Sequence, residues 1–198
     1  MRFPLRHPVC CALALSAALA CATPSASADS GDTALTNLIS LVSQRLALAE
    51  PVARWKWAHH KPITDAPREA ALLADVEKRA ASAQVDPALA HAFFEDQIDA
   101  SKEVQHALFD QWRSTAAPTG AAPDLASQIR PELDRLTPLM IAALSRVQTL
   151  RDAPDCPMRV ADSLANWKNL TRYDSSRSDA LAHALGHVCA AGGVGATG

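Results

Sequence analysis

Two cations occupy a helix face that should be buried. Leu41, Arg45, Leu48, Val52 and Lys56 follow one another at intervals of four, three, four and four residues, which is the spacing of a single helical face. Eleven residues make about three turns, so Arg45 and Lys56 would lie in line, roughly 16 Å apart along the axis. Burying unpaired cations is costly, which predicts an anionic partner. The alternative is that both side chains reach solvent and only their stems are covered.

A second helical face carries neutral polar groups where a core helix would have leucine. Gln97, Ser101 and Gln105 lie one turn apart on this face. The whole face consists of Ala90, Phe94, Gln97, Ser101, Gln105, Leu108 and Trp112. Buried amides and hydroxyls need hydrogen-bond partners, from another helix or from a ligand. The pattern therefore indicates either a structural polar layer or a binding site.

Arg68 lies where a helix disfavours a cation. It falls in the first turn of the helix expected after Asp65, where the dipole favours the negative charge of the neighbouring Glu69 instead. A residue choice that opposes local physics tends to mark function. The alternative is a surface pair between Asp65 and Arg68, which would contribute little. Nothing in the sequence around Arg130, just before Pro131, distinguishes it from an ordinary solvated arginine.

The chain that carries these residues favours helices throughout. Val, Ile and Thr are sparse, and no alternation of apolar and polar residues persists. The composition, 48% hydrophobic over 198 residues, predicts one all-α domain. We expect six helices, the first and third of them long, near residues 33–59 with a kink at Pro51, 65–83, 86–113, 124–151, 157–172 and 177–190.

Two helix starts and one linker are marked clearly. Asp65 and Asp86 are expected N-caps, each followed by a proline in the first helical turn, where the missing N–H matters little. The stretch near 115–123 is rich in Ala, Pro and Gly, and it is the one clear linker. The elements on either side of it must together position the polar residues described above.

The N-terminus has the three parts of a signal peptide over residues 1–28: a positive start, an apolar run and a small-residue cleavage site. We therefore expect a mature domain at 29–198 that is periplasmic or secreted. An alternative makes Cys21 a lipoprotein attachment site, although the usual leucine is one place out of register. No later stretch approaches the ~18 uncharged apolar residues that a membrane span needs.

Export has consequences for charge and for cysteine chemistry. Loss of Arg2 and Arg6 with the signal would change the net charge from −2 to −4, and an acidic surface disfavours nucleic acid as a partner. Two cysteines would remain, Cys156 and Cys189, and an oxidising compartment predicts a disulfide between them. The alternative, two free thiols with a redox role, has no C-x-x-C motif in its favour.

Four segments, in order along the chain, carry a recognisable pattern. They are R-L-x-L-A-x-P-V-A-R-W-K-W at 45–57, P-I-x-D-x-x-R-E at 62–69, F-F-x-D-Q-I-x-A-S-K-x-V-Q at 93–105 and I-R-P-x-L-D-x-L at 129–136. Together they resemble the exported, all-helical chorismate mutases of the AroQ type, gamma subclass. The resemblance covers nearly all of the expected mature chain, including the two late cysteines.

The resemblance implies an enzyme that converts chorismate to prephenate by an intramolecular Claisen rearrangement, the chemistry of phenylalanine and tyrosine biosynthesis. This reaction needs no nucleophile, metal or cofactor. Accordingly, the sequence has no G-x-G-x-x-G motif or P-loop, and His183 and His187 lack the glutamate of H-E-x-x-H, so we expect no metal site. The resemblance also implies a homodimer with each active site inside one chain.

Four residues are implied to hold the two substrate carboxylates. Arg45, Arg68 and Arg130 would bind them through planar, forked donors, and Ser101 would contact one of them. Leu72, one turn after Arg68, stands where some relatives have a polar side chain, which is a departure from the family pattern in that part of the site.

The remaining implied contacts concern the reacting centre and the ring hydroxyl. Lys56 and Gln105 would donate to the ether oxygen, which gains negative charge as its bond to carbon breaks. Some relatives have Glu in place of Gln105. Glu69, with Asp65 nearby, would orient the ring hydroxyl. The residues expected to be catalytic are thus Lys56, Gln105 and Arg45.

Two non-catalytic functions are also compatible with an exported helical protein. The chain could be a non-catalytic exported binding or effector protein on the same scaffold. Five intact residues that folding would not need argue against this reading: Arg45, Lys56, Arg68, Gln105 and Arg130. A structural or chaperone-like helical bundle is the second rival, and it should expose an apolar groove.

Overall fold

Helices account for all the regular structure in residues 25–192, the part of the chain that this computed structural model describes. They are α1 (Ser25–Ala47), α2 (Ala49–Ala58), α3 (Ala66–Ser82), α4 (Pro87–Ser114), α5 (Arg130–Val147), α6 (Cys156–Thr171) and α7 (Ser175–His183). Short turns at Leu125–Ile129 and Gln148–Leu150 flank α5. The predicted all-α class is confirmed, and α1 and α2 together correspond to the first of the six predicted helices. The predicted signal peptide lies almost entirely outside the described residues.

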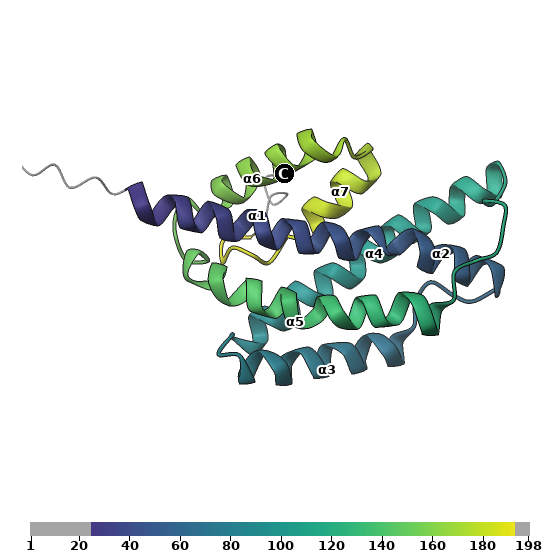
Figure 1. The fold of residues 1–198 in the computed structure, drawn as a ribbon, viewed down its shortest axis with the longest axis horizontal. Coiled ribbons are helices and arrows are strands. Elements are labelled where there is room, and N and C mark those ends of the chain that lie inside the picture. The colour runs from purple at the N-terminus through teal and green to yellow at the C-terminus, as the bar shows by residue number, and fades with distance from the viewer. Residues whose placement is uncertain (1–24, 193–198) are drawn as a thin grey trace, which may run out of the picture.

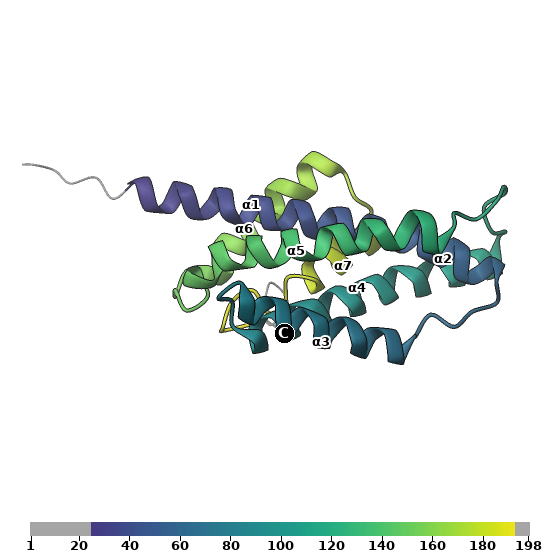
Figure 2. The same cartoon turned by 60° about the horizontal axis from the view of Figure 1, so that its bottom comes forward.

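The helices form an elongated bundle (Figure 1). The α1–α2 rod packs along α5 and continues onto α4, while α3 packs against α4 on the opposite side of the bundle (Figure 2). Helices α6 and α7 cover α1 and α4. Fully buried side chains such as Leu38, Val42, Phe94 and Leu144 fill the space between α1, α4 and α5. None of the described helices is long and apolar enough to cross a membrane.

The predicted kink at Pro51 is present as an interruption of the helix at Leu48, three residues before the proline. The Leu48 N–H donates to Arg45 O at 3.1 Å, which tightens the last turn of α1. A proline ring clashes with the carbonyl four residues earlier, here that of Ala47, so the regular helix must break before Pro51. Arg45 therefore lies in the last turn of α1 and Lys56 in the last turn of α2.

The predicted starts of α3 and α4 are confirmed by their caps. The Asp65 carboxylate accepts a hydrogen bond from the backbone N–H of Arg68 at 3.4 Å, and that of Asp86 accepts from Ala88 at 2.9 Å. These bonds satisfy N–H groups that have no partner inside the helix. The Asp65 cap fixes where α3 begins, and with it the positions of Arg68 and Glu69.

The predicted helix at 124–151 begins with a widened turn. The Arg130 N–H donates to Leu125 O, five residues back, and regular α5 starts only at Arg130. In a regular helix the ring of Pro131 would crowd the carbonyl of Ser127, and a wider turn relieves that clash. Arg130 consequently lies at the N-terminal end of α5.

The last predicted helix is shorter than expected, since α7 ends at His183 and tight turns follow it to Gly192. The prediction of a helix to residue 190 was therefore wrong. The backbone N–H of His187 donates to the Asp96 carboxylate of α4 at 2.9 Å instead of to a helical carbonyl. This tertiary hydrogen bond replaces the helical one and fixes the segment after α7 to α4.

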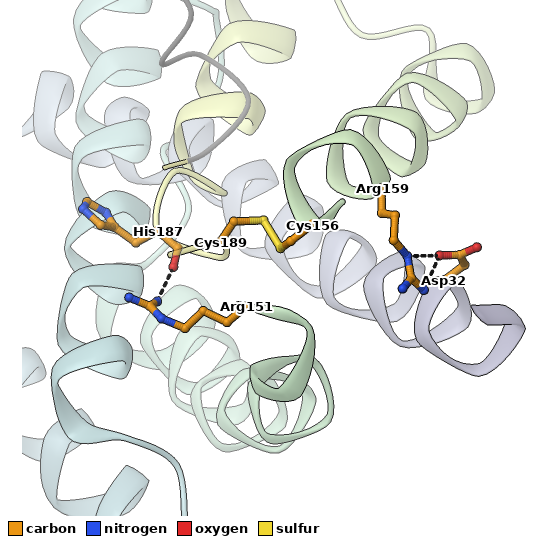
Figure 3. Close-up of a disulfide and its surroundings, with 6 residues drawn as sticks. All are labelled: Asp32, Arg151, Cys156, Arg159, His187 and Cys189. Carbon is orange, nitrogen blue, oxygen red and sulfur yellow. Dashed lines mark hydrogen bonds and ion pairs between the residues drawn. A yellow bond between two sulfur atoms is a disulfide. The ribbon is translucent and has the colours of Figure 1, made fainter. Parts of the chain in front are cut away.

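The predicted disulfide between Cys156 and Cys189 is confirmed (Figure 3). It joins the first residue of α6 to the segment after α7, over a sequence separation of 33 residues. In the chain-entropy account, closing such a loop contributes roughly 3–4 kcal/mol to stability. Arg151 donates to His187 O at 2.9 Å beside it, and Arg159 pairs with Asp32 of α1 at 2.8 Å. These contacts hold the C-terminal segment against the bundle.

Candidate active site

A cavity of about 550 Å³ lies between the α1–α2 rod, α3, α4 and the start of α5. We call it the central cavity. All eight side chains selected from the sequence line it, namely Arg45, Lys56, Asp65, Arg68, Glu69, Ser101, Gln105 and Arg130. Residues as distant in the sequence as 45 and 130 are thus brought to one place by the packing of four helical segments.

Arg45, in the last turn of α1, is buried. Its side chain is 8% exposed, so the alternative in which it reaches solvent is wrong. One guanidinium nitrogen, Nη1, donates to the backbone carbonyl of Gln97 at 3.0 Å. Burial, helped by the nearby charge of Arg68, lowers the pKa of Arg45 to about 10. No carboxylate of the described residues pairs with it, so an anionic ligand would supply its missing counter-charge.

Lys56 is half-buried at the end of α2. Its ammonium donates to the carbonyl of Ile63, in the segment that connects α2 to α3. Burial lowers the pKa of Lys56, and the charges of Asp65 and Glu69 only partly oppose this. Within residues 25–192, neither carboxylate comes close enough to Lys56 to form an ion pair. The ammonium therefore keeps donor capacity for a ligand.

Arg68 and Arg130 bring two further guanidinium groups to the cavity. Asp65 accepts only the backbone N–H of Arg68, and the surface pair between the two side chains is not formed in the described structure. The Nε of Arg130 is buried without a hydrogen-bond partner among the described residues. A buried donor left unpaired costs about 1–3 kcal/mol, so this N–H favours binding of an acceptor.

The sequence left open whether the polar face of α4 is a structural layer or a binding site, and the structure shows some of each. Gln97 is structural, because its side-chain amide donates to Ala184 O at the end of α7 and to Phe93 O at 3.3 Å. Ser101 and Gln105 instead line the cavity, and Gln105 Nε2 donates to both Ser101 O and Ser101 Oγ at 3.1 Å.

The Gln105 amide has an unused polar atom. Its side chain is 3% exposed, and its Oε1 is buried without a partner in the part of the chain that the structure describes. The amide nitrogen carries two hydrogens, and one of them suffices for the hydrogen bond shared by Ser101 O and Oγ. Gln105 can therefore offer either an acceptor or a donor to a ligand.

Glu69 is held at both of its carboxylate oxygens. Oε1 accepts the backbone N–H of Asp65 at 3.0 Å, and Oε2 lies 3.4 Å from Nζ of Lys102. Lys102 in turn lies 2.8 Å from Asp99 on its own helix. Glu69 is thus a fixed acceptor on the α3 side of the cavity.

The lining carries more positive than negative charge, in a chain whose net charge is −2. The cationic side chains are Arg45, Lys56, Lys61, Arg68, Lys102 and Arg130, and the carboxylates are Asp65, Glu69 and Asp134. Lys61, Lys102 and Asp134 were not predicted from the sequence to belong to the site. Lys102 gave a weak signal, since Asp99 precedes it by three residues and the two have the spacing of a surface ion pair. A cationic cavity on an acidic chain favours a small anion as its ligand.

The two late histidines do not line the central cavity. His183 Nδ1 lies 2.7 Å from Glu103, and His187 Nδ1 lies 2.8 Å from Asp96, both on α4. Burial raises the pKa of Asp96, although its hydrogen bonds from His187 oppose the shift. Within residues 25–192, no three His, Cys, Asp or Glu side chains gather in a way that could hold a metal ion. Both histidines serve to dock the C-terminal segment on α4.

Known proteins resemble this chain over most of its length. Residues 32–106 match the family model described as chorismate mutase type II. The secreted chorismate mutase of Mycolicibacterium smegmatis is 33% identical over 178 residues, 89% of this chain and 97% of that protein. That of Mycobacterium tuberculosis is 30% identical over 168 residues, 85% and 84% of the two chains. A crystal structure of chorismate mutase from Burkholderia thailandensis is 68% identical, with a TM-score of 0.78 over 79% of this chain and 99% of that one.

Proposed function

The chain belongs to the chorismate mutase type II family and is a chorismate mutase, an isomerase, and we propose that its reaction takes place in the central cavity. The reaction is the intramolecular Claisen rearrangement of chorismate, a dianion, to prephenate. One observation supports this proposal above all. Arg45, Lys56 and Arg130 line the cavity, and none of them forms an ion pair with a carboxylate of residues 25–192.

The substrate carboxylates bind to the three arginines. Arg45, Arg68 and Arg130 present planar, forked donors, which match the two oxygens of a carboxylate. Binding satisfies the buried Nε of Arg130 and gives Arg45 the counter-charge that the protein does not provide. Ser101 contacts one of the carboxylates through its hydroxyl.

Lys56 and Gln105 donate to the ether oxygen. Negative charge develops on this oxygen as the carbon–oxygen bond breaks, so donors already in place stabilise the transition state more than the substrate. The Gln105 amide nitrogen carries two hydrogens, so it can keep a hydrogen bond to Ser101 and donate the other hydrogen to the ether oxygen, and the Ser101 hydroxyl hydrogen stays available for a carboxylate. Holding the flexible dianion in its folded, reactive conformer supplies the rest of the acceleration.

Glu69, with Asp65 beside it, orients the ring hydroxyl. Each carboxylate oxygen has two lone pairs, and the bonds from the Asp65 N–H and from Lys102 leave one free on each oxygen of Glu69. Leu72 contributes an apolar surface to the same wall of the cavity.

The pH profile of kcat/KM tests these assignments. Gln105 donates at every pH because an amide does not titrate, so activity should show no increase at acid pH that depends on this position. Turnover is followed as the loss of chorismate absorbance on adding the purified protein. A rate that rose tenfold per pH unit below pH 6 would contradict the assignment of Gln105.

The alkaline side of the same profile depends on the protonation of Lys56 and Arg45. Burial lowers the pKa of both Lys56 and Arg45, and each must be protonated to bind or donate. Their contribution is complete below these pKa values and is lost as the pH rises through them, so kcat/KM should fall on the alkaline side, towards pH about 10 for Arg45. In kcat the fall should lie at higher pH, because the bound dianion favours the charged forms.

The protein is exported, in keeping with the names of its secreted relatives. We propose that residues 1–28 are the signal peptide, that 29–198 form the mature domain, and that the product is periplasmic or secreted. We further propose a homodimer in which each chain contains a complete active site. A complete site in each chain is supported because residues of one chain supply the whole lining of the cavity. The molecular mass measured by light scattering tests the dimer.

The two non-catalytic rivals are not favoured. A chaperone-like bundle should expose an apolar groove, but nine charged side chains interrupt the apolar lining of the central cavity. The exposed large apolar side chains of residues 25–192 are only Leu139, Met158 and Leu170. The relatives that match nearly the whole chain are named as chorismate mutases, which favours the enzyme over an effector.

A further inference from the structure

Lys102 connects the side of α4 that faces the central cavity to α3. It follows Ser101 directly, lines the central cavity, and has a side chain that is only 25% exposed. Its ammonium lies 2.8 Å from Asp99 and 3.4 Å from Glu69, so it bridges a carboxylate of its own helix and one of the neighbouring helix. Helices α3 and α4 lie side by side, which makes this bridge short (Figure 2).

The bridge matters because Glu69 has other cations nearby. The charge of Glu69 acts on Lys56, and the charges of Arg68 and Lys102 act on Lys56 as well, so these groups share one electrostatic environment. An ionised carboxylate that is free to turn is drawn to the nearest cation. An ion pair of Glu69 with Lys56 or Arg68 would occupy a donor that the substrate needs.

Lys102 is less suited than these cations to bind the substrate itself. Two carboxylates already share its single positive charge, so the group of Asp99, Lys102 and Glu69 carries a net negative charge. Its hydrogen bond with Asp99 is the main reason why the pKa of Lys102 is raised, and it stays protonated at neutral pH. Lys102 is therefore a constant counter-charge within the protein.

We infer that Lys102 is a positioning residue: it holds the Glu69 carboxylate in place for the ring hydroxyl and so leaves Lys56 and Arg68 unpaired for the substrate. The inference rests on the proposed role of Glu69. It goes beyond the family pattern of substrate contacts, because Lys102 acts on the substrate only through Glu69.

A double-mutant cycle tests the inference, with kcat and KM for chorismate measured on Lys102→Met, Glu69→Gln and the double variant. Lys102→Met should lower kcat/KM about tenfold, the scale of one charge-assisted hydrogen bond. Glu69→Gln should lower it by at least as much. In the Glu69→Gln background Lys102→Met should have little further effect, because the charge that Lys102 controls has already been removed.

Two further variants separate positioning from folding. Lys102→Arg keeps the cation between Asp99 and Glu69 and should retain kcat/KM within about threefold. Lys78→Met, on the exposed side of α3, is the matched control and should equal the wild type in activity and melting temperature. All variants should melt cooperatively near the wild-type temperature, because the bridge is partly exposed and contributes little stability.

Two outcomes would overturn the inference and leave the rest of the site intact. One is wild-type kcat/KM for Lys102→Met while Glu69→Gln is impaired. The other is an equal loss from Lys102→Met in both backgrounds, which would mean that Lys102 contacts the substrate directly. Wild-type activity of Glu69→Gln would instead remove the proposed role of Glu69, and the inference with it.

Discussion

Replacing Lys56 by alanine should lower kcat by about a hundredfold to a thousandfold. The ammonium is the cation assigned to the ether oxygen, and loss of one preorganised donor to a developing negative charge typically has an effect of this size. The fold should survive, because the half-buried side chain makes one hydrogen bond, to the carbonyl of Ile63, and no ion pair within residues 25–192. Steady-state turnover of chorismate and circular dichroism of the variant measure both parts.

Lys78→Ala is the matched control for this experiment, since Lys78 is an exposed lysine on α3 outside the central cavity. It should turn over chorismate like the wild type. Unchanged kcat in a correctly folded Lys56→Ala variant would remove the proposed mechanism, even though the family assignment would stand.

Replacing Arg45 by lysine should lower kcat/KM by about a hundredfold, mostly through KM. The substitution keeps a positive charge but removes the fork that binds both oxygens of a carboxylate. A charged hydrogen bond in a buried site contributes about 1.5–3 kcal/mol, and about 1.4 kcal/mol is a factor of ten. An ammonium at this 8% exposed position is also more easily deprotonated than a guanidinium, which adds to the loss at alkaline pH.

Arg146→Lys provides the comparison for Arg45, because Arg146 is exposed on α5 and does not line the cavity. It should leave kcat, KM and the melting temperature unchanged. If Arg45→Lys retained the wild-type KM while folding normally, Arg45 would not be a carboxylate ligand.

The cavity lining was largely predictable because helical spacing shows which polar residues share a face with apolar ones. Arg45 and Lys56 stood out in this way, as did Ser101 and Gln105. Spacing alone does not separate a structural amide from one in a site. Gln97 has the same spacing, yet its amide donates to the carbonyl of Ala184, just after α7, a contact between residues 87 positions apart in the sequence.

Residues that act across helices were harder to identify. Lys102 and Asp99 have the spacing of an ordinary surface pair, and the contact with Glu69 depends on how α3 packs against α4. Arg130 was unremarkable by position, because nothing in the local sequence shows that its Nε is buried in the folded chain. Its role was expected only from the family resemblance.

The helices themselves were predicted well, and their ends were predicted less well. The caps at Asp65 and Asp86 are local interactions, so the sequence shows them directly. The end of α7 is set by a distant carboxylate, because Asp96 takes the N–H of His187 out of the helical pattern. The disulfide was predictable because only two cysteines follow the expected signal peptide, Cys156 and Cys189.

The proposed active site is tested most directly by a crystal structure of the protein with a stable dicarboxylate analogue of the bicyclic transition state. We expect the analogue in the central cavity, with its carboxylates on Arg45, Arg68 and Arg130. Its ether oxygen should lie about 3 Å from both the Lys56 ammonium and the Gln105 amide nitrogen. An analogue bound elsewhere, or with its ether oxygen facing only apolar side chains, would contradict the assignment of the central cavity as the active site.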